Sequence, residues 1–386
     1  MRASQIRHLG VALVMGLTLT ACAPAVSNPP PSSASPSSAP VQSIPVASEV
    51  FGPAEWSAQA RKGSTPLVLS GVVVLVTDRG VTGVDADGKE LWRADLDLLS
   101  GAANPDGGRD VIAVTPDVVA VIDKGVLPKG SDPLAADAPG TRVTLLNVTD
   151  GSEIAQQYLP GEQVKRTTGL AFEIAGNAPE YVAFTPIGEK ITAQDGKFPL
   201  ATVGEHIVWG MPYTANMGAQ VMHVTGLPLE NATLAASDER DIVVLTSYDG
   251  TTTTTMWVNL ATGEPLTPDS ACPQTLLPKT LTPSLNGAFV VGDNAIADTE
   301  NRTITCTGGS DGQRPVLWSA VTNEGVAYGQ TADANDTFVI GRDSSIETVT
   351  IPAAAAHTVL VGFVSDRTAI LYDRNTGIVN ANPTRK

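Results

Sequence analysis

The sequence has 386 residues, 42% of them hydrophobic, and its 40 acidic side chains outnumber 24 Lys and Arg, which gives a formal net charge of −16. The apolar fraction is too high for a disordered protein. The negative charge argues against binding to nucleic acid, because proteins neutralise its phosphates with Lys and Arg. Three cysteines are too few for a small domain held together by many disulfides.

Residues 1–21 are typical of a secretory signal peptide. Arg2 and Arg7 form a basic start, and the mostly apolar run Leu9–Leu19 is shorter than the roughly 20 residues that span a bilayer. The segment Leu19–Cys22 resembles the lipobox of bacterial lipoproteins, in which a Leu and two small residues precede a Cys. This resemblance implies cleavage before Cys22, a lipid on its thiol, and a protein anchored on the extracytoplasmic face of a bacterial membrane.

Residues 22–48 are rich in Pro and Ser and carry almost no charge. Such a composition cannot bury a core, and its Pro-rich parts favour an extended chain. We therefore expect a flexible tether over 22–48 and a folded domain over 49–386.

From Pro66 onward, short runs rich in Val, Ile and Thr alternate with Gly, Asp and Asn, which is typical of strands and turns. The clearest unit is an antiparallel meander made of Val72–Thr77, Val81–Asp85 and Glu90–Arg93. Similar units recur at 143–154, 242–264, 289–306 and 359–377, and we expect residues 125–140 to be an inserted loop.

An Asp or Asn ends a run of each unit, at positions 85, 147, 259, 298 and 373, with weaker candidates at Asp195, His223 and Gly341. These positions recur about every 41 residues, a period typical of β-propellers. The predicted fold is all-β, a β-propeller of seven or eight blades with eight favoured. We expect the strands near 44–58 to pair with the last unit and close the ring. Two β-sandwich domains are the alternative.

Val74–Arg93 (VLVTDRGVTGVDADGKELWR) resembles the PQQ-like β-propeller repeat, with its apolar strand, its Asp-Gly-Lys turn and its closing Trp. Together with the lipobox, this unit is similar to the BamB-like outer-membrane assembly lipoproteins. The resemblance implies an eight-bladed, non-enzymatic protein that binds a partner protein.

Cys272 and Cys306 are the two cysteines outside the lipobox. An even pair in an oxidising compartment predicts a disulfide, and both residues follow the third strand of adjacent predicted units. A redox or nucleophilic thiol is the alternative, although no His lies within 45 positions of either cysteine.

Several motif matches do not carry the chemistry that their spacing suggests. Gly83–Lys89 has P-loop spacing, but Glu90 replaces the Ser or Thr and a strand, not a helix, follows. Gly308–Gly312 matches G-x-S-x-G, but loop and strand residues follow it. Acidic turns that hint at calcium, but lack an EF-hand ligand set, are Asp85–Gly88, Asp249–Gly250 and Asp333–Asp336.

The remaining histidines, His206, His223 and His357, have no metal-ligand spacing. We therefore predict no catalytic, cofactor-binding or metal-binding residue, and we expect the five Trp to pack between blades. The predicted function is that of a monomeric, non-catalytic protein-binding or scaffold module in the bacterial cell envelope, without a cofactor. The alternatives are a small-molecule or glycan sensor and, third, a calcium- or quinone-dependent enzyme.

Overall fold

The structure, a computed structural model, describes residues 41–385 with gaps at 101–108, 129–137, 177, 212–220, 224–231, 249, 271, 274–276, 308–314, 333–336 and 343–344. The predicted signal peptide 1–21, the predicted lipidation site Cys22 and residues 23–40 of the predicted tether lie outside this range. Among the described residues, no helix is long and apolar enough to cross a membrane.

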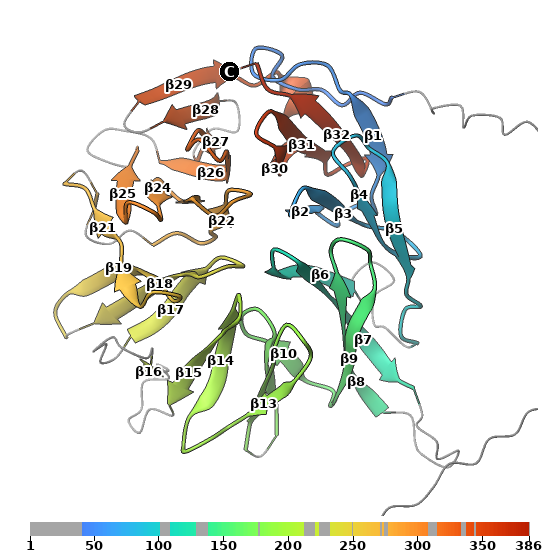
Figure 1. The fold of residues 1–386 in the computed structure, drawn as a ribbon, viewed down its shortest axis with the longest axis vertical. Helices are drawn as coiled ribbons and strands as arrows, with labels where there is room; N and C mark the ends of the chain where they lie inside the picture. The colour runs from blue at the N-terminus through green and yellow to red at the C-terminus, as the bar shows by residue number, and fades with distance from the viewer. Residues whose placement is uncertain are drawn as a thin grey trace, which may run out of the picture. The chain divides into compact units, whose positions relative to one another are not determined.

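The protein is all-β, as predicted, with a single 3-10 helix η1 (Ala353–Ala355) in the described part of the chain. Its strands form sheets that are arranged in a ring, which identifies a β-propeller and excludes the two-sandwich alternative (Figure 1). In most sheets each strand pairs antiparallel with its neighbour in the chain, from the centre of the ring outward.

The first sheets along the chain contain β2 (Leu67–Leu69), β3 (Val72–Val76), β4 (Gly80–Val84) and β5 (Glu90–Asp95); β6 (Arg109–Thr115), β7 (Val118–Leu127), β8 (Ala138–Asn147) and β9 (Glu153–Pro160); β10 (Val164–Arg166), β11 (Ala171–Ile174), β12 (Glu180–Phe184) and β13 (Lys190–Thr192); and β14 (Phe198–Val203), β15 (His206–Met211) and β16 (Val221–His223).

The remaining sheets contain β17 (Ala232–Ser237), β18 (Ile242–Tyr248), β19 (Thr253–Asn259) and β20 (Glu264–Pro265); β21 (Thr267–Pro268), β22 (Thr282–Pro283), β23 (Phe289–Gly292), β24 (Ala295–Asp298) and β25 (Thr303–Cys306); β26 (Val316–Val321), β27 (Ala327–Thr331), β28 (Thr337–Arg342) and β29 (Ser345–Thr350); and β1 (Trp56–Gln59) with β30 (Thr358–Ser365), β31 (Thr368–Asp373) and β32 (Ile378–Pro383).

The number of blades differs from the eight that we favoured. Sheet β10–β13 comes between β6 and β14 in the chain, yet β14 contacts β6 directly. Figure 1 draws β10 farther from the centre of the ring than the tip of β14. Within the described residues, the ring around the channel is therefore closed by seven blades, and the short sheet β10–β13 packs beside it.

The ring closes as predicted, because β1 from the start of the folded chain pairs with β32 at its end, from Trp56↔Ala381 to Gln59↔Ile378. Residues 41–48, which we assigned to the tether, belong to this closure. Ile44 and Ala47 are buried in the core, and the side chain of Asn380 donates to the Gln42 carbonyl at 3.0 Å. The composition of 22–48 hides these two apolar contacts, so the tether prediction is too long at its end.

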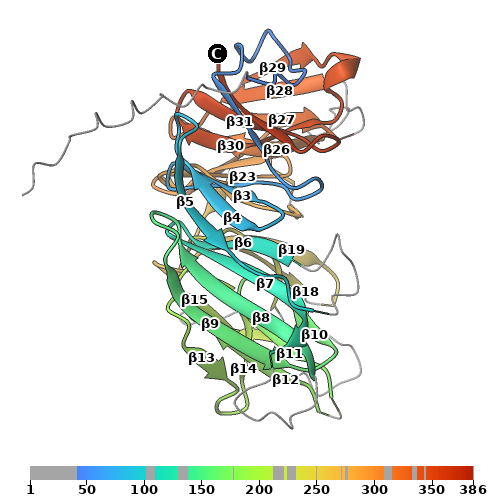
Figure 2. The ribbon, with the colours of Figure 1, turned by 90° about the vertical axis from the view of Figure 1, so that its right-hand side faces the viewer.

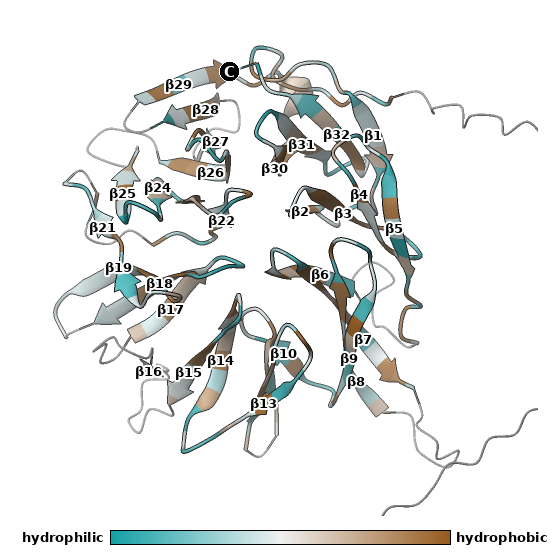
Figure 3. Cartoon of the chain, in the orientation of Figure 1, coloured by the Kyte–Doolittle hydropathy of each residue, from teal (hydrophilic) through white to brown (hydrophobic). Residues whose placement is uncertain are grey.

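The middle strands of the first blade are buried on both faces, because a neighbouring sheet covers each side. All five residues of β3 are buried, as is all of β4, which explains why the repeats appear as continuous apolar runs. Figure 2 shows β4 and β5 from the side, next to β6 and β7. Hydropathy decreases toward the rim, where β13 and β21 are more hydrophilic than β2 or β3 (Figure 3).

The expected loop 125–140 is partly sheet. The ladder between β7 and β8 continues to Leu127↔Ala138, with Gly125 opposite Gly140. A Cβ at Gly140 would come within 2.5 Å of the Leu159 carbonyl oxygen, so glycine permits the pairing to extend. The turn residues 129–137 lie outside the described range.

A buried charge cluster fixes the segment that enters sheet β6–β9. Asp123 on β7 accepts from Arg109 at 2.8 Å and from Arg142 at 2.6 Å. Arg109 also donates to the Leu96 carbonyl at 2.7 Å, and Arg142 to the Asp97 carbonyl. Both carbonyls follow β5, so the cluster joins two neighbouring blades.

Two tryptophans dock one blade onto the next, as expected for inter-blade packing. Trp56 Nε1 on β1 donates to the Ala86 carbonyl at 2.7 Å, and Trp92 Nε1 on β5 donates to the Val148 carbonyl at 2.6 Å. Each ring lies over a turn glycine of positive φ. A Cβ at Gly151 would be 2.5 Å from the Trp92 ring, and Gly88 is equally close to Trp56. The Trp of one blade therefore packs against the Asp-Gly turn of the next blade.

We predict that Trp92→Ala lowers the free energy of unfolding by about 3–5 kcal/mol, because it empties a buried inter-blade site. The measurement is urea unfolding followed by circular dichroism. Leu91→Ala is the matched control, since Leu91 is the neighbouring residue and is 45% exposed, and it should change stability by less than about 0.5 kcal/mol. Equal effects of the two substitutions would contradict the docking role of Trp92.

Candidate functional site at the channel mouth

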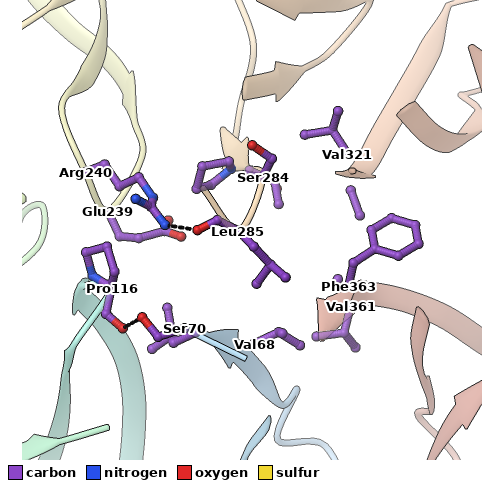
Figure 4. A pocket seen from close by; sticks show the side chains of 15 residues that line it. Val68, Ser70, Pro116, Glu239, Arg240, Ser284, Leu285, Val321, Val361 and Phe363 are labelled. Atoms are coloured by element: carbon purple, nitrogen blue, oxygen red, sulfur yellow. Dashed lines mark hydrogen bonds between the residues drawn. The ribbon is translucent and has the colours of Figure 1, made fainter. Parts of the chain in front are cut away.

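The turns that join the first and second strands of the blades converge at one end of the central channel. Figure 4 shows Ser70, Pro116, Glu239 and Leu285 facing the same pocket, with Phe363 from β30 on its opposite side. We call this end of the channel the mouth and define it by the turns 70–71, 116–117, 204–205, 238–241, 284–288, 322–325 and 366–367.

Neighbouring turns of the mouth are joined by hydrogen bonds. Ser70 Oγ donates to the Pro116 carbonyl at 2.8 Å, Arg240 donates to the Leu285 carbonyl, and the Asn286 amide donates to Asn323 Oδ1 at 2.9 Å. Each bond links two different blades. The mouth is therefore held in one arrangement by contacts between its turns as well as by the sheets behind them.

The turn 238–241 carries the most unusual electrostatics of the mouth. Asp238 is 6% exposed, and its Oδ1 accepts from the amides of Arg240 and Ile242, both at 2.9 Å. Its Oδ2 is buried without a hydrogen-bond partner. Burial raises the pKa of Asp238 to about 6. Burial, followed by the neighbouring charge of Asp238, raises the pKa of Glu239 to about 7.

Carboxylates dominate the mouth. Its turns carry the acidic residues Asp117, Glu205, Asp238, Glu239, Asp241, Glu324 and Asp366, against the cations Arg240 and Arg367. His206 adds a side chain that contacts Asp241 Oδ1 at 3.0 Å. Because several like charges surround one opening, their fields add there and attract positively charged groups.

The pocket beneath the mouth is small. Its volume is about 40 Å³, which is enough for a few water molecules at roughly 10–15 Å³ each. Pockets for drug-sized ligands and cofactors are on the order of 300–1,000 Å³. The pocket beneath the mouth is therefore well below the size of such a site.

Cys272 and Cys306 form a disulfide, with Cα atoms 5.0 Å apart. Their positions differ from our prediction in one respect, because both are next to or within strands of a single sheet and do not occupy equivalent places in adjacent units. Cys306 ends β25, and Cys272 follows β21, the outer strand that pairs in parallel with β25. The bond fixes this two-residue edge strand, which has little pairing of its own.

The other predicted positions divide between turns and undescribed residues. Gly83–Lys89 ends one strand and turns into another, with Asp85 Oδ1 accepting from the amides of Asp87 and Lys89, as expected for a β-turn. Among the described residues, no three His, Cys, Asp or Glu side chains are grouped for a metal ion. The motifs Gly308–Gly312, Asp333–Asp336 and Asp249 lie outside the described residues.

Sequence analysis did not single out the acidic mouth. A signal was present in the run Ser237–Asp241 (SDERD), four charged residues after a Ser between two apolar runs. Such a run is ordinarily a solvated turn. Only the ring brings it next to carboxylates that are far apart in the sequence.

We predict a pH dependence of stability that originates at Asp238. An unfolded Asp releases its proton near pH 4, whereas the folded protein keeps it up to about pH 6. Between these values the folded state binds more protons, so stability falls as the pH rises through this window. The free energy of unfolding of Asp238→Asn, relative to that of the wild type, should therefore rise by about 3 kcal/mol from pH 4 to pH 7.

The measurement is urea unfolding of both proteins across this pH range. Asp366→Asn changes an exposed carboxylate of the same mouth and should leave the pH profile unchanged. A difference between Asp238→Asn and the wild type that does not vary with pH would refute the assignment.

We also predict that the Cys272→Ser/Cys306→Ser double variant loses about 3–4 kcal/mol of stability, because the bond closes a loop of 34 residues in the unfolded chain. The measurement is thermal unfolding with and without reductant. Reductant should lower the melting temperature of the wild type to that of the variant. A wild-type melting temperature that is insensitive to complete reduction would contradict the prediction.

Comparison with known proteins finds structural neighbours but no relative by sequence. No protein-family model and no curated protein matches the sequence. Among solved structures, the Dos1 propeller aligns with 85% of this chain and 93% of its own at 10% identity and a TM-score of 0.43. The Cps50 (Swd1) β-propeller domain of Myceliophteria thermophila aligns with 84% and 97% at 12% identity and a TM-score of 0.37. At these values the likeness carries no conclusion about fold or function.

Proposed function

We propose that the protein is a lipid-anchored, monomeric and non-catalytic binding module of the bacterial cell envelope, which presents its propeller to another envelope protein. The lipobox-like segment Leu19–Cys22 supports the anchor and the extracytoplasmic location. The PQQ-like unit Val74–Arg93 supports the relation to BamB-like lipoproteins, and its Trp-to-turn docking occurs twice around the ring.

The observation that carries the proposal is the acidic, hydrogen-bonded mouth above a pocket of about 40 Å³. A rigid mouth loses little conformational entropy on binding. Its chemistry also defines the partner. A concentration of carboxylates complements a basic surface, and such charges mainly increase the association rate and its dependence on salt.

The experiment is chemical cross-linking in intact cells, followed by capture of the lipidated protein and identification of the attached partner. One stoichiometric partner is expected. Cys22→Ala should abolish the cross-link, because the unanchored protein is no longer concentrated at the membrane. No reproducible partner in cells with confirmed lipidation would contradict a scaffold role.

A second variant tests whether the mouth is the contact surface. Glu205→Gln/Glu324→Gln removes two exposed charges from the mouth and should reduce the cross-linked fraction several-fold. The control Glu55→Gln/Glu162→Gln removes two exposed carboxylates that precede β1 and follow β9, and it should have no effect. Equal losses from both double variants would exclude the mouth as a specific binding surface.

A further inference from the structure

We propose a second site, independent of the mouth, in which the groove between β6–β7 and β10–β11 binds a small organic anion. The groove has a volume of about 420 Å³, in contrast to about 40 Å³ under the mouth. This lies within the range of roughly 300–1,000 Å³ that is typical of small-molecule sites. It is lined by Asp110, Ile122, Lys124, Val164, Lys165, Arg166, Thr167 and Phe172.

Strand alternation determines which side chains face into the groove. Ile122 is part of the core that sheets β6–β9 and β10–β13 share, so Lys124, two residues along β7, lies on the same face. Val164 belongs to the same core, which likewise places Arg166 of β10 on the groove side. Lys165 lies between them and belongs to the opposite face of β10.

Lys124 and Arg166, the two cations that face the groove, have N–H donors that can bind a ligand. Lys124 Nζ donates to the Val164 carbonyl at 3.1 Å, and an ammonium group has two further N–H donors. Arg166 donates to Asp110 Oδ2 at 3.1 Å. The side chains of this ion pair are 34% and 57% exposed, and so exposed a pair contributes little stability. The guanidinium can therefore exchange Asp110 for a ligand at small cost.

The groove combines this charge with an apolar floor. Val164 and Phe172 are buried beneath it, as is Ile122. The chain as a whole has a net charge of −16, so a groove with Lys and Arg against one Asp is a local exception. The ligand that matches has a compact phosphate or carboxylate, which Arg binds in bidentate fashion, on a small aromatic or aliphatic body that fits the groove.

The experiment is isothermal titration calorimetry of the folded protein with phenyl phosphate, benzoate and phenol as probes. Phenyl phosphate and benzoate distinguish the two anionic groups, and phenol tests the apolar body alone. We expect one saturable site for at least one anion, no measurable binding of phenol, and weaker binding at higher salt.

Three variants locate the site. Arg166→Gln and Lys124→Ala should each lower the affinity for the anion at least tenfold. The control Lys62→Ala, which removes an exposed cation near β1 and β2, should leave the affinity unchanged. Asp110→Asn should strengthen binding severalfold, because it frees the guanidinium and removes a repelling charge. An increase in affinity cannot result from misfolding, so this variant keeps the test valid if Arg166→Gln is unstable.

Three results would overturn the proposal. One is the absence of saturable binding for both anions with the folded wild type. Another is a loss of affinity in Lys62→Ala equal to that in Arg166→Gln, which would indicate non-specific attraction. The third is unchanged or weaker binding by Asp110→Asn.

Discussion

A blade of short strands cannot bury both of its faces alone, and this constraint determines the rest of the structure. Each sheet depends on two neighbours, so the ring is stable only when the last gap is closed. The closure comes from β1, which brings the start of the folded chain to its end at β32. The same dependence explains the fully buried strand β3 and the repeated contact of a Trp with the turn of the next blade.

The ring also creates the two candidate sites, in different ways. At the mouth, blades that are distant in the sequence bring their first turns together, and the buried Asp238 lies in one of these turns. The groove arises where sheet β10–β13 interrupts the regular series of blades. Sheet β10–β13 does not reach the channel, and its short inner strand lies beside β6 and β7 with space between them.

Much of the fold could be predicted from the sequence, because local composition encodes it. The unit Val72–Arg93, the ring closure and the cysteine pair all depend on strand propensity, on a repeat or on residue type. The anchor at Asp195 was wrong, since this residue follows β13 with φ 49°. The equivalent turn is formed by Thr185, whose hydroxyl accepts from the Glu189 amide at 3.0 Å. A Thr in place of Asp or Asn gave no signal in the pattern.

The candidate sites were largely invisible for a related reason. The carboxylates of the mouth come from five turns that are far apart in the sequence, and no spacing rule connects Asp117 to Glu324. Likewise, Lys124 and Arg166 are 42 positions apart, on strands whose contact follows only from the packing of two sheets. Strand pairing is determined by short stretches of sequence, whereas these sites depend on the packing of segments that are distant in the sequence.

Closure by both termini has a mechanical consequence. A pull on the chain at residue 41 is applied first to the bonds from Asn380 to Gln42 and from Thr358 to the Pro45 carbonyl. It then acts along β1, whose four residue pairs with β32 would be loaded together in shear. Residues 41–48 therefore also hold the ring closed. If the predicted tether is present, tension in it would be resisted by the same contacts that keep the propeller closed.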